Sequence, residues 1–262
     1  MNKQKILYAL AGLIAGCAIG FFFANSVNRK ELEGLRGEVA RARSNAGAAQ
    51  PAGGERRADG NATNAAAGES MPTETEIRDL VAKADASPDN ADYQRKVGQG
   101  VYMYALSTGQ PALMPEAVRL LKRAHEADPK NYETTVLLGN SLFALAQVAD
   151  AANFGEARVY YNKALATKPE DANVRTLLGM TYFFGRPSDP ERAIKEYRRS
   201  LATEPRQEMA LQSLAAALID TGAHAEAQQR IEELQAVNSA NNALSNLRAQ
   251  LAQAKNAAKE KD

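Results

Sequence analysis

The chain of 262 residues has no tryptophan, one cysteine and two histidines. A single cysteine cannot form a disulfide within the chain, so the fold depends on apolar packing. The cysteine content therefore does not indicate whether the protein resides in a reducing or an oxidising compartment. A broad excess of positive charge is also missing, since 32 lysines and arginines face 31 aspartates and glutamates. That balance argues against nucleic-acid binding. Abundant alanine and few β-branched residues favour an all-α protein.

Signals of catalysis are missing as well. No glycine-rich phosphate loop precedes a helix, and no pair of cysteines has the spacing of metal ligands. His125 and His224 fall on or near different helical segments, so each is expected to be a surface or packing residue. We therefore expect no enzymatic activity, no catalytic residue, no cofactor and no bound metal.

The N-terminus carries an uncharged apolar run from Ile6 to Ala24. A helix needs roughly 20 such residues to cross the hydrocarbon core of a bilayer. Residues 1–25 are therefore predicted to form a transmembrane anchor. The alternative is a lipoprotein signal, because the residues ending at Cys17 resemble a bacterial lipobox; the apolar residues that continue past Cys17 favour the uncleaved span. Either interpretation holds the protein on a membrane.

Small residues recur every four positions within this run, at Gly12, Gly16 and Gly20. Residues spaced by four share a helix face, so a second helix could approach closely there. This spacing predicts a possible homodimer through the membrane segment. The alternative is the ordinary glycine content of a bacterial membrane helix.

Three segments connect the anchor to the rest of the chain. Residues 26–43 carry Leu32, Leu35 and Val39 at helical spacing and are predicted to form a helical stalk. Residues 44–71 are rich in Ala, Gly, Asn and Ser, and a segment with so little apolar bulk is predicted to be a disordered linker. Residues 72–88 are predicted to contain a leading helix, which opens with a capping box that pairs Thr73 with Glu76.

From about residue 89 onward a unit recurs four times. Its first half ends in a large residue followed by a small one: Val97-Gly98, Leu138-Gly139, Leu178-Gly179 and Leu214-Ala215. Its second half has a small residue at Ala117, Ala157, Ala193 and Ala227, and four residues later a large one at Leu121, Tyr161, Tyr197 and Ile231. Twelve residues after each of these alanines come Pro129, Pro169, Pro205 and Ser239.

These positions resemble the tetratricopeptide-repeat (TPR) motif, a helix–turn–helix unit of about 34 residues. We expect repeats at 89–129, 130–169, 170–205 and 206–239, followed by a C-terminal capping helix and tail at 240–262. The resemblance implies an all-α TPR helix–turn–helix solenoid, here with an N-terminal transmembrane helix. In each unit the small residues should let the two helices approach, and the large ones, such as Tyr161, should fill space against the next unit. Insertions in the first two units, and Ser239 in place of proline, depart from the motif.

The resemblance also implies a concave groove lined by the first helix of each repeat. The predicted partner-binding residues are Arg95, Gln99, Tyr102, Glu133, Asn140, Phe143, Asn173, Met180, Phe183, Phe184 and Gln212. Amide side chains can bond a peptide backbone, and aromatic residues and methionine can take its apolar side chains. The alternative for Phe143, Phe183 and Phe184 is core packing.

Two long connections, about residues 107–116 and 147–156, join the helices of the first two repeats. Insertions at the same place in neighbouring repeats project from the same edge, so they could form a lip beside the groove. Slack loops or longer helices are the alternative.

These features favour a membrane-anchored scaffold that binds a partner peptide or helix. The layout resembles that of bacterial factors that assist c-type cytochrome maturation and envelope assembly, which implies the inner membrane and a periplasmic C-terminal domain. The alternative is a self-associating structural membrane protein with no foreign ligand. Topology stays open, because more basic residues follow the apolar run than precede it, and that count alone would keep the domain cytoplasmic.

Overall fold

The computed structural model describes residues 72–149 and 151–259, which are helical with short turns and contain no strand. Clustering of backbone contacts separates them into two compact units, one ending at Ala127 and one beginning at Asp128. Within the described part, none of the helices has the length and apolar character needed to cross a bilayer. The predicted anchor with Gly12, Gly16, Gly20 and Cys17, the stalk and the linker all lie outside the described residues.

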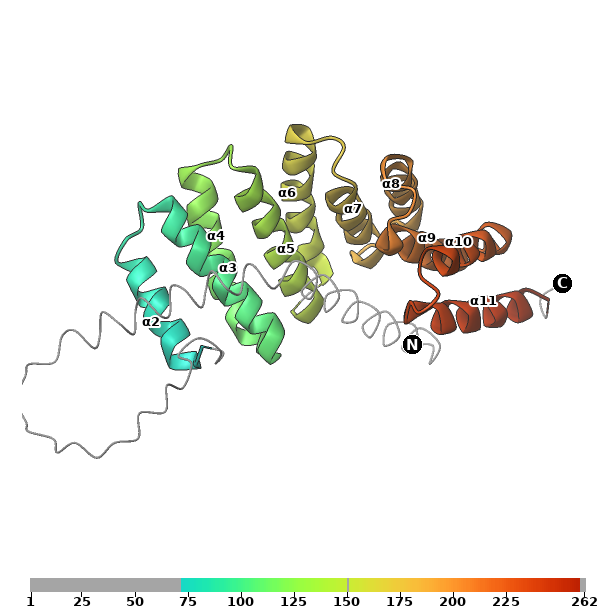
Figure 1. Cartoon of the computed structure of the whole chain (residues 1–262), viewed down its shortest axis with the longest axis horizontal. Helices are drawn as coiled ribbons and strands as arrows, with labels where there is room; N and C mark the ends of the chain where they lie inside the picture. The colour runs from blue at the N-terminus through green and yellow to red at the C-terminus, as the bar shows by residue number, and fades with distance from the viewer. Residues whose placement is uncertain (1–71, 150, 260–262) are drawn as a thin grey trace, which may run out of the picture. The chain divides into compact units, whose positions relative to one another are not determined.

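From residue 72 on, where the structure describes it, the unit that ends at Ala127 contains three α-helices and one 3-10 turn (Figure 1). These are α2 (Glu74–Asp85), α3 (Ala91–Thr108), η1 (Pro111–Leu113) and α4 (Met114–Ala127). The predicted capping box opens α2: the Thr73 hydroxyl accepts from the Glu76 backbone N–H, and the Glu76 carboxylate accepts from the Thr73 backbone N–H. The two groups thereby satisfy backbone donors that the first turn of a helix cannot pair internally.

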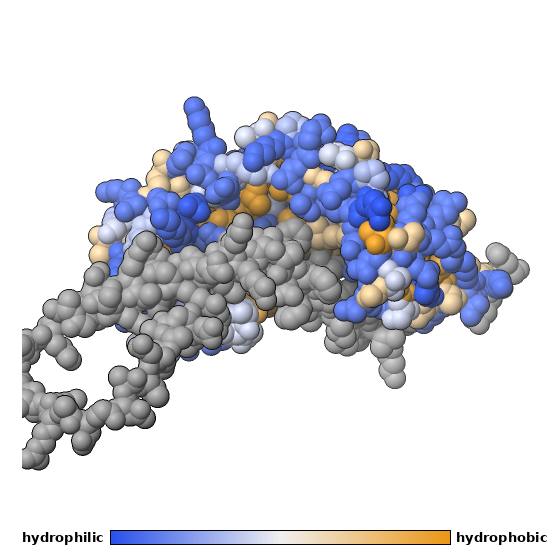
Figure 2. Space-filling model, in the orientation of Figure 1, coloured by the Kyte–Doolittle hydropathy of each residue, from blue (hydrophilic) through white to orange (hydrophobic). Residues whose placement is uncertain are grey.

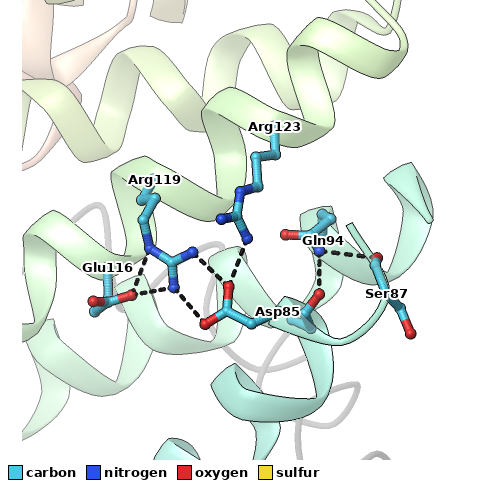
Figure 3. A network of polar contacts seen from close by, with 7 residues as sticks. Asp85, Ser87, Gln94, Glu116, Arg119 and Arg123 are labelled. Carbon is cyan, nitrogen blue, oxygen red and sulfur yellow. Dashed lines mark hydrogen bonds and ion pairs between the residues drawn. The ribbon is translucent and has the colours of Figure 1, made fainter. Parts of the chain in front are cut away.

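A network of polar contacts ties α2 to α3 and α4 (Figure 3). Asp85, at the end of α2, accepts hydrogen bonds from Arg119 and Arg123 of α4, and Arg119 also contacts Glu116. The hydrogen bond from Arg119 is the main reason that the pKa of Asp85 lies below its ordinary value. On α3, the buried Gln94 amide donates to the backbone carbonyls of Ala84 and Ser87, which closes the C-terminal end of α2.

The unit that begins at Asp128 continues as a row of helices. In order these are α5 (Tyr132–Val148), η2 (Ala151–Asn153), α6 (Phe154–Thr167), α7 (Ala172–Phe184), α8 (Pro190–Thr203), α9 (Glu208–Asp220), α10 (His224–Val237) and α11 (Ala243–Lys259). Each α-helix packs against the next one in sequence (Figure 1). Asn131 and Asp171 cap α5 and α7 by accepting from the backbone N–H three residues on.

The small residues do let paired helices approach. A Cβ added to Gly139 of α5 would lie 2.7 Å from Tyr161 Cε1 on α6, and one added to Gly179 of α7 would lie 2.6 Å from Tyr197 Cε1 on α8. Both tyrosines are completely buried. Each ring lies on the glycine of its own repeat. The Tyr197 hydroxyl also lies beside Ser213 of α9, so this ring reaches the next unit as the sequence predicted.

The insertions in the first two repeats form longer first helices rather than slack loops. α3 and α5 have 18 and 17 residues, whereas α7 and α9 have 13 each. A 3-10 turn then leads directly into α4 and into α6. The inserted residues thus extend the helices by about one turn, which is one of the alternatives that the sequence left open.

The last helix covers the end of the row. α11 packs against α10 and α9 and buries Leu244, Leu247 and Leu251, the apolar stripe seen in the sequence. Its remaining residues are mostly exposed amides, alanines and charged side chains. α11 thereby gives the apolar side of the last pair a polar outer surface, as a terminal repeat requires.

Candidate protein-interaction surface

In the unit that begins at Asp128, from α7 onward, the first helices of the pairs lie closer to one another than the second helices do. α7 contacts α9, and α9 contacts α11, beyond their contacts with sequence neighbours. Among the described helices of this unit, no contact of similar extent joins α6 to α8 or α8 to α10. A row bends toward its more closely spaced members, so α7 and α9 lie on its inner side. As the first helix of its own pair, α5 has the corresponding place in the repeat and is grouped with α7 and α9. We call their solvent-facing residues the inner face.

On α5, the predicted residues fall into exposed and buried positions. Glu133 is exposed and Asn140 is half-buried, with its side-chain oxygen accepting from the Tyr161 hydroxyl at 3.0 Å. Phe143 is buried, and its ring packs edge-on against Phe154 of α6 with centroids 4.9 Å apart. The structure therefore places Phe143 in the core, and Asn140 supports a buried tyrosine while keeping part of its surface in solvent.

On α7, the apolar candidates also divide. Met180 is buried, with 1% of its surface exposed, whereas Phe183 and Phe184 are half-buried at the C-terminal end of the helix. The two rings meet edge-on with centroids 5.2 Å apart. Asn173 is exposed at the other end of α7, where its oxygen accepts from the Gln207 side-chain amide at 2.7 Å.

The C-terminal end of α7, where the two phenylalanines lie, is held by Arg158 of α6. Arg158 donates to the Thr181 backbone carbonyl at 2.9 Å, and its guanidinium lies 4.1 Å from the centroid of the Tyr182 ring. A last-turn carbonyl is thus paired, and the cation stacks on an aromatic face. These contacts hold the last turn of α7, which carries Phe183 and Phe184, against α6.

On α9, Gln212 is half-buried, as are Met209 and Ile219. The inner face of this unit therefore combines amides on all three helices with half-buried apolar side chains on α7 and α9. The view in Figure 2 shows a mainly hydrophilic surface in which hydrophobic residues appear in limited areas.

The remaining predicted residues belong to the other compact unit, on α3. Arg95 is half-buried and pairs with Asp92 at 2.9 Å, and Gln99 is half-buried. Tyr102 is half-buried and packs against the apolar cluster that includes Leu80. These three residues share one helix, separate from the inner face defined above.

One buried polar cluster was missed from the sequence. Gln207 precedes α9, and its side-chain oxygen lies 2.6 Å from the Thr176 hydroxyl and 2.7 Å from the Ser200 hydroxyl. The Ser200 hydroxyl also lies within hydrogen-bond distance of the Ala172 carbonyl. The cluster joins α7, α8 and the start of α9. The available signal was a glutamine at the position where the earlier repeats carry the helix-capping residues Asn131 and Asp171.

The described residues contain no group of three or more His, Cys, Asp and Glu side chains that could hold a metal ion. His125 is buried on α4, and His224 is half-buried at the first position of α10. The structure thus places the two histidines on different compact units.

Comparison with known proteins finds a match only among solved structures: no protein family and no curated protein matches the chain. A crystal structure of MamA is 21% identical, with a TM-score of 0.51 over 63% of this chain and 87% of that one. MamA from residue 41 to its end, from Desulfovibrio magneticus RS-1, is 16% identical, with a TM-score of 0.53 over 64% of this chain and 87% of that one. At such identities the similarity concerns the fold.

The prediction of an all-α, TPR-like fold is confirmed for the described residues. Their helices pair through contacts between a small residue and a large one, as in Gly139 with Tyr161 and Gly179 with Tyr197. TTC0263, a thermophilic TPR protein in Thermus thermophilus, is 17% identical, with a TM-score of 0.48 over 70% of this chain and 98% of that one.

Proposed function

We propose that the chain is a membrane-anchored scaffold that binds a segment of a partner protein on the inner face of its repeats. The observation that carries this proposal is the combination on α7 and α9 of exposed or half-buried amides, Asn173 and Gln212, with the half-buried rings of Phe183 and Phe184. Two packed helices hold these side chains in place, so little ordering entropy is lost when a partner binds.

The chemistry of this surface suits a polypeptide ligand. Amide side chains can both donate to and accept from a peptide backbone, and half-buried aromatic rings offer apolar anchors. Among the partner-binding residues predicted from the sequence, the positively charged one is Arg95, and it already pairs with Asp92. A partner that depends on a free acidic C-terminus is therefore disfavoured here.

Membrane attachment rests on the apolar run that ends at Ala24, which has the length of a bilayer-spanning helix. In this proposal the anchor sits in a bacterial inner membrane and the repeats act in the periplasm, assisting the assembly of envelope protein complexes. Labelling an introduced cysteine at the exposed Ser239 with an impermeant reagent, in cells with a permeabilised outer membrane, tests the side. Labelling only after lysis would place the domain in the cytoplasm instead.

Site-specific photo-crosslinking tests the inner face. A photoreactive residue at Phe183 or Gln212 of the full-length protein should capture one discrete protein partner. The matched controls are Glu191 and Lys195, exposed residues of α8, a second helix. Capture at the α8 positions and not at the α7 and α9 positions would contradict the assignment, and a product with twice the mass of the chain would favour self-association.

A further inference from the structure

A pocket of about 470 Å³ opens between the C-terminal end of α8, the turn before α9 and α10, and lies apart from the inner face. Its apolar lining includes Leu201, Pro205 and Val237, and its charged lining is Arg206, Arg230 and Glu233. The volume falls in the range of sites that accommodate small organic groups. All of these residues belong to the unit that begins at Asp128.

The corresponding place in the preceding repeat is occupied by a side chain of the protein itself. There Arg175 of α7 donates to the Pro169 carbonyl at 2.6 Å and pairs with Glu196 of α8 at 3.1 Å. Glu196 also pairs with Arg199 at 3.0 Å. The Arg175 guanidinium therefore lies between the counterparts of two residues that line the pocket, since Pro169 corresponds to Pro205 and Glu196 to Arg230.

The fourth repeat reverses the charges and omits the occupant. Arg230 stands where the third repeat has Glu196, and Glu233 stands where it has Arg199. The counterpart of Arg175 is Leu211, which is fully buried in the core and has no polar atom to offer. The space that Arg175 fills in the third repeat is thus open in the fourth, where Arg230 lies in its wall.

Arg230 is left with unused bonding capacity. Its Nη1 pairs with Glu233 at 3.0 Å, but its buried Nε finds no hydrogen-bond partner among the described residues. The Nε itself is enclosed, but 25% of the Arg230 side chain is exposed, so the rest of its guanidinium can take a second acceptor beside Glu233. Arg206, exposed at the rim, adds a second positive charge beside the same opening.

We propose that this pocket binds an acidic side chain of a partner protein, with the carboxylate at Arg230 and Arg206 and an adjacent apolar side chain against Leu201 and Val237. A carboxylate alone gains little at a partly exposed arginine. A polypeptide supplies both the carboxylate and the apolar contact, which is why it suits the mixed lining better than a free acid does.

The test measures fluorescence polarisation of a labelled peptide Gly-Ser-Leu-Glu-Leu-Ser-Gly with the full-length protein, beside a twin peptide in which Gln replaces Glu. The Glu peptide should bind roughly tenfold tighter than its twin, as expected for a hydrogen bond to a charged group. Arg230→Gln should abolish that preference. Equal binding of the two peptides, no binding of either, or an unchanged preference in Arg230→Gln would overturn the proposal.

Two further variants separate binding from folding. Arg175→Gln, in the third repeat, should lower the melting temperature but leave the peptide preference intact. The triple exchange Leu211→Arg, Arg230→Glu and Glu233→Arg installs the third-repeat set, so it should stop binding of the Glu peptide while circular dichroism stays helical. A triple variant that folds and still prefers the Glu peptide would overturn the proposal, and so would free glutarate that competes at the peptide's own concentration. Phe183→Ala, on the inner face, should leave this binding unchanged.

Discussion

The third and fourth repeats, α7–α8 and α9–α10, carry the same pair of helices with different residues at corresponding positions. Gly179 accommodates the ring of Tyr197 in the third repeat, whereas Ala215 and Ile231 occupy these positions in the fourth. Asp171 caps α7 through the Val174 N–H at 2.8 Å, whereas Gln207 turns its amide toward Thr176 and Ser200. Both repeats thus fill the space between their paired helices and provide hydrogen-bond partners for the polar groups where one helix follows another. They do so with different residues.

The largest expected effect comes from breaking the volume balance of the third repeat. Gly179→Ala places a methyl group 2.6 Å from a buried ring, so the free energy of unfolding of the full-length protein should fall by up to about 3 kcal/mol. Chemical denaturation followed by circular dichroism measures it. Gly155→Ala, at an exposed helical glycine with open space around it, is the matched control and should be neutral or stabilising.

Adding Tyr197→Ile to Gly179→Ala gives the third repeat the small–large pair of the fourth. Stability should recover in part, because the ring that clashed is gone. If the double variant loses more free energy of unfolding than the two single variants lose together, the Gly–Tyr pair of the third repeat and the Ala–Ile pair of the fourth are not interchangeable.

Gln207→Leu tests the polar junction. The hydroxyls of Thr176 and Ser200 lose a shared acceptor in a buried site, so we expect a loss of about 2 kcal/mol. Asp171→Ala removes the cap of α7 and the acceptor of the Tyr132 hydroxyl, which is part-buried and can bond to water instead, so it should cost about 1 kcal/mol. Thermal unfolding of both variants compares them, and a larger loss in Asp171→Ala would reverse the roles assigned to the two junctions.

Alkaline pH should destabilise the protein through the buried Tyr197 of the third repeat, and also through Tyr132 of α5, because burial raises the pKa of both. Burial raises the pKa of Tyr197 above its ordinary value of 10.0, so the native state keeps a proton that the unfolded chain releases. The contribution of Tyr197 to the free energy of unfolding should therefore fall as pH rises above about 10, by about 1.4 kcal/mol per pH unit, and stay unchanged below it. In Tyr197→Ile this contribution disappears, so wild-type and variant curves that run parallel from about pH 9 to 11 would contradict the prediction.

The smallest effect concerns the surface contact between the two repeats. Arg198 of α8 and Glu226 of α10 pair at 2.7 Å, with 54% and 33% of their side chains exposed. An exposed ion pair contributes little, so Arg198→Ala should cost about 0.5 kcal/mol, and less in high salt. Denaturation at two salt concentrations checks this, and a loss above the Gln207→Leu value would mean that the repeats depend on surface charge.

Sequence periodicity located the helices because local patterns encode them. The capping box at Thr73, the stripe at Leu244, Leu247 and Leu251, and the small residues at Gly139 and Gly179 are all found where the pattern indicated. The candidate binding residues were less predictable. Phe143 and Phe183 both fit a groove position, yet one is buried and the other half-buried, because α5 is a turn longer than α7 and leads into the turn before Phe154.

By itself the sequence determined that the chain is helical, that its helices pair through small residues, and that its N-terminal residues include an apolar run of membrane-spanning length. Only the tertiary structure shows that the Tyr161 ring packs on Gly139 of its own repeat and that Gln207 joins three helices. It also shows that Arg230 has no counterpart of the Arg175 side chain that pairs with Glu196. The physical reason is that helix formation and amphipathicity depend on near neighbours in the chain. Burial and polar pairing depend on side chains from other helices, whose distances no single segment encodes.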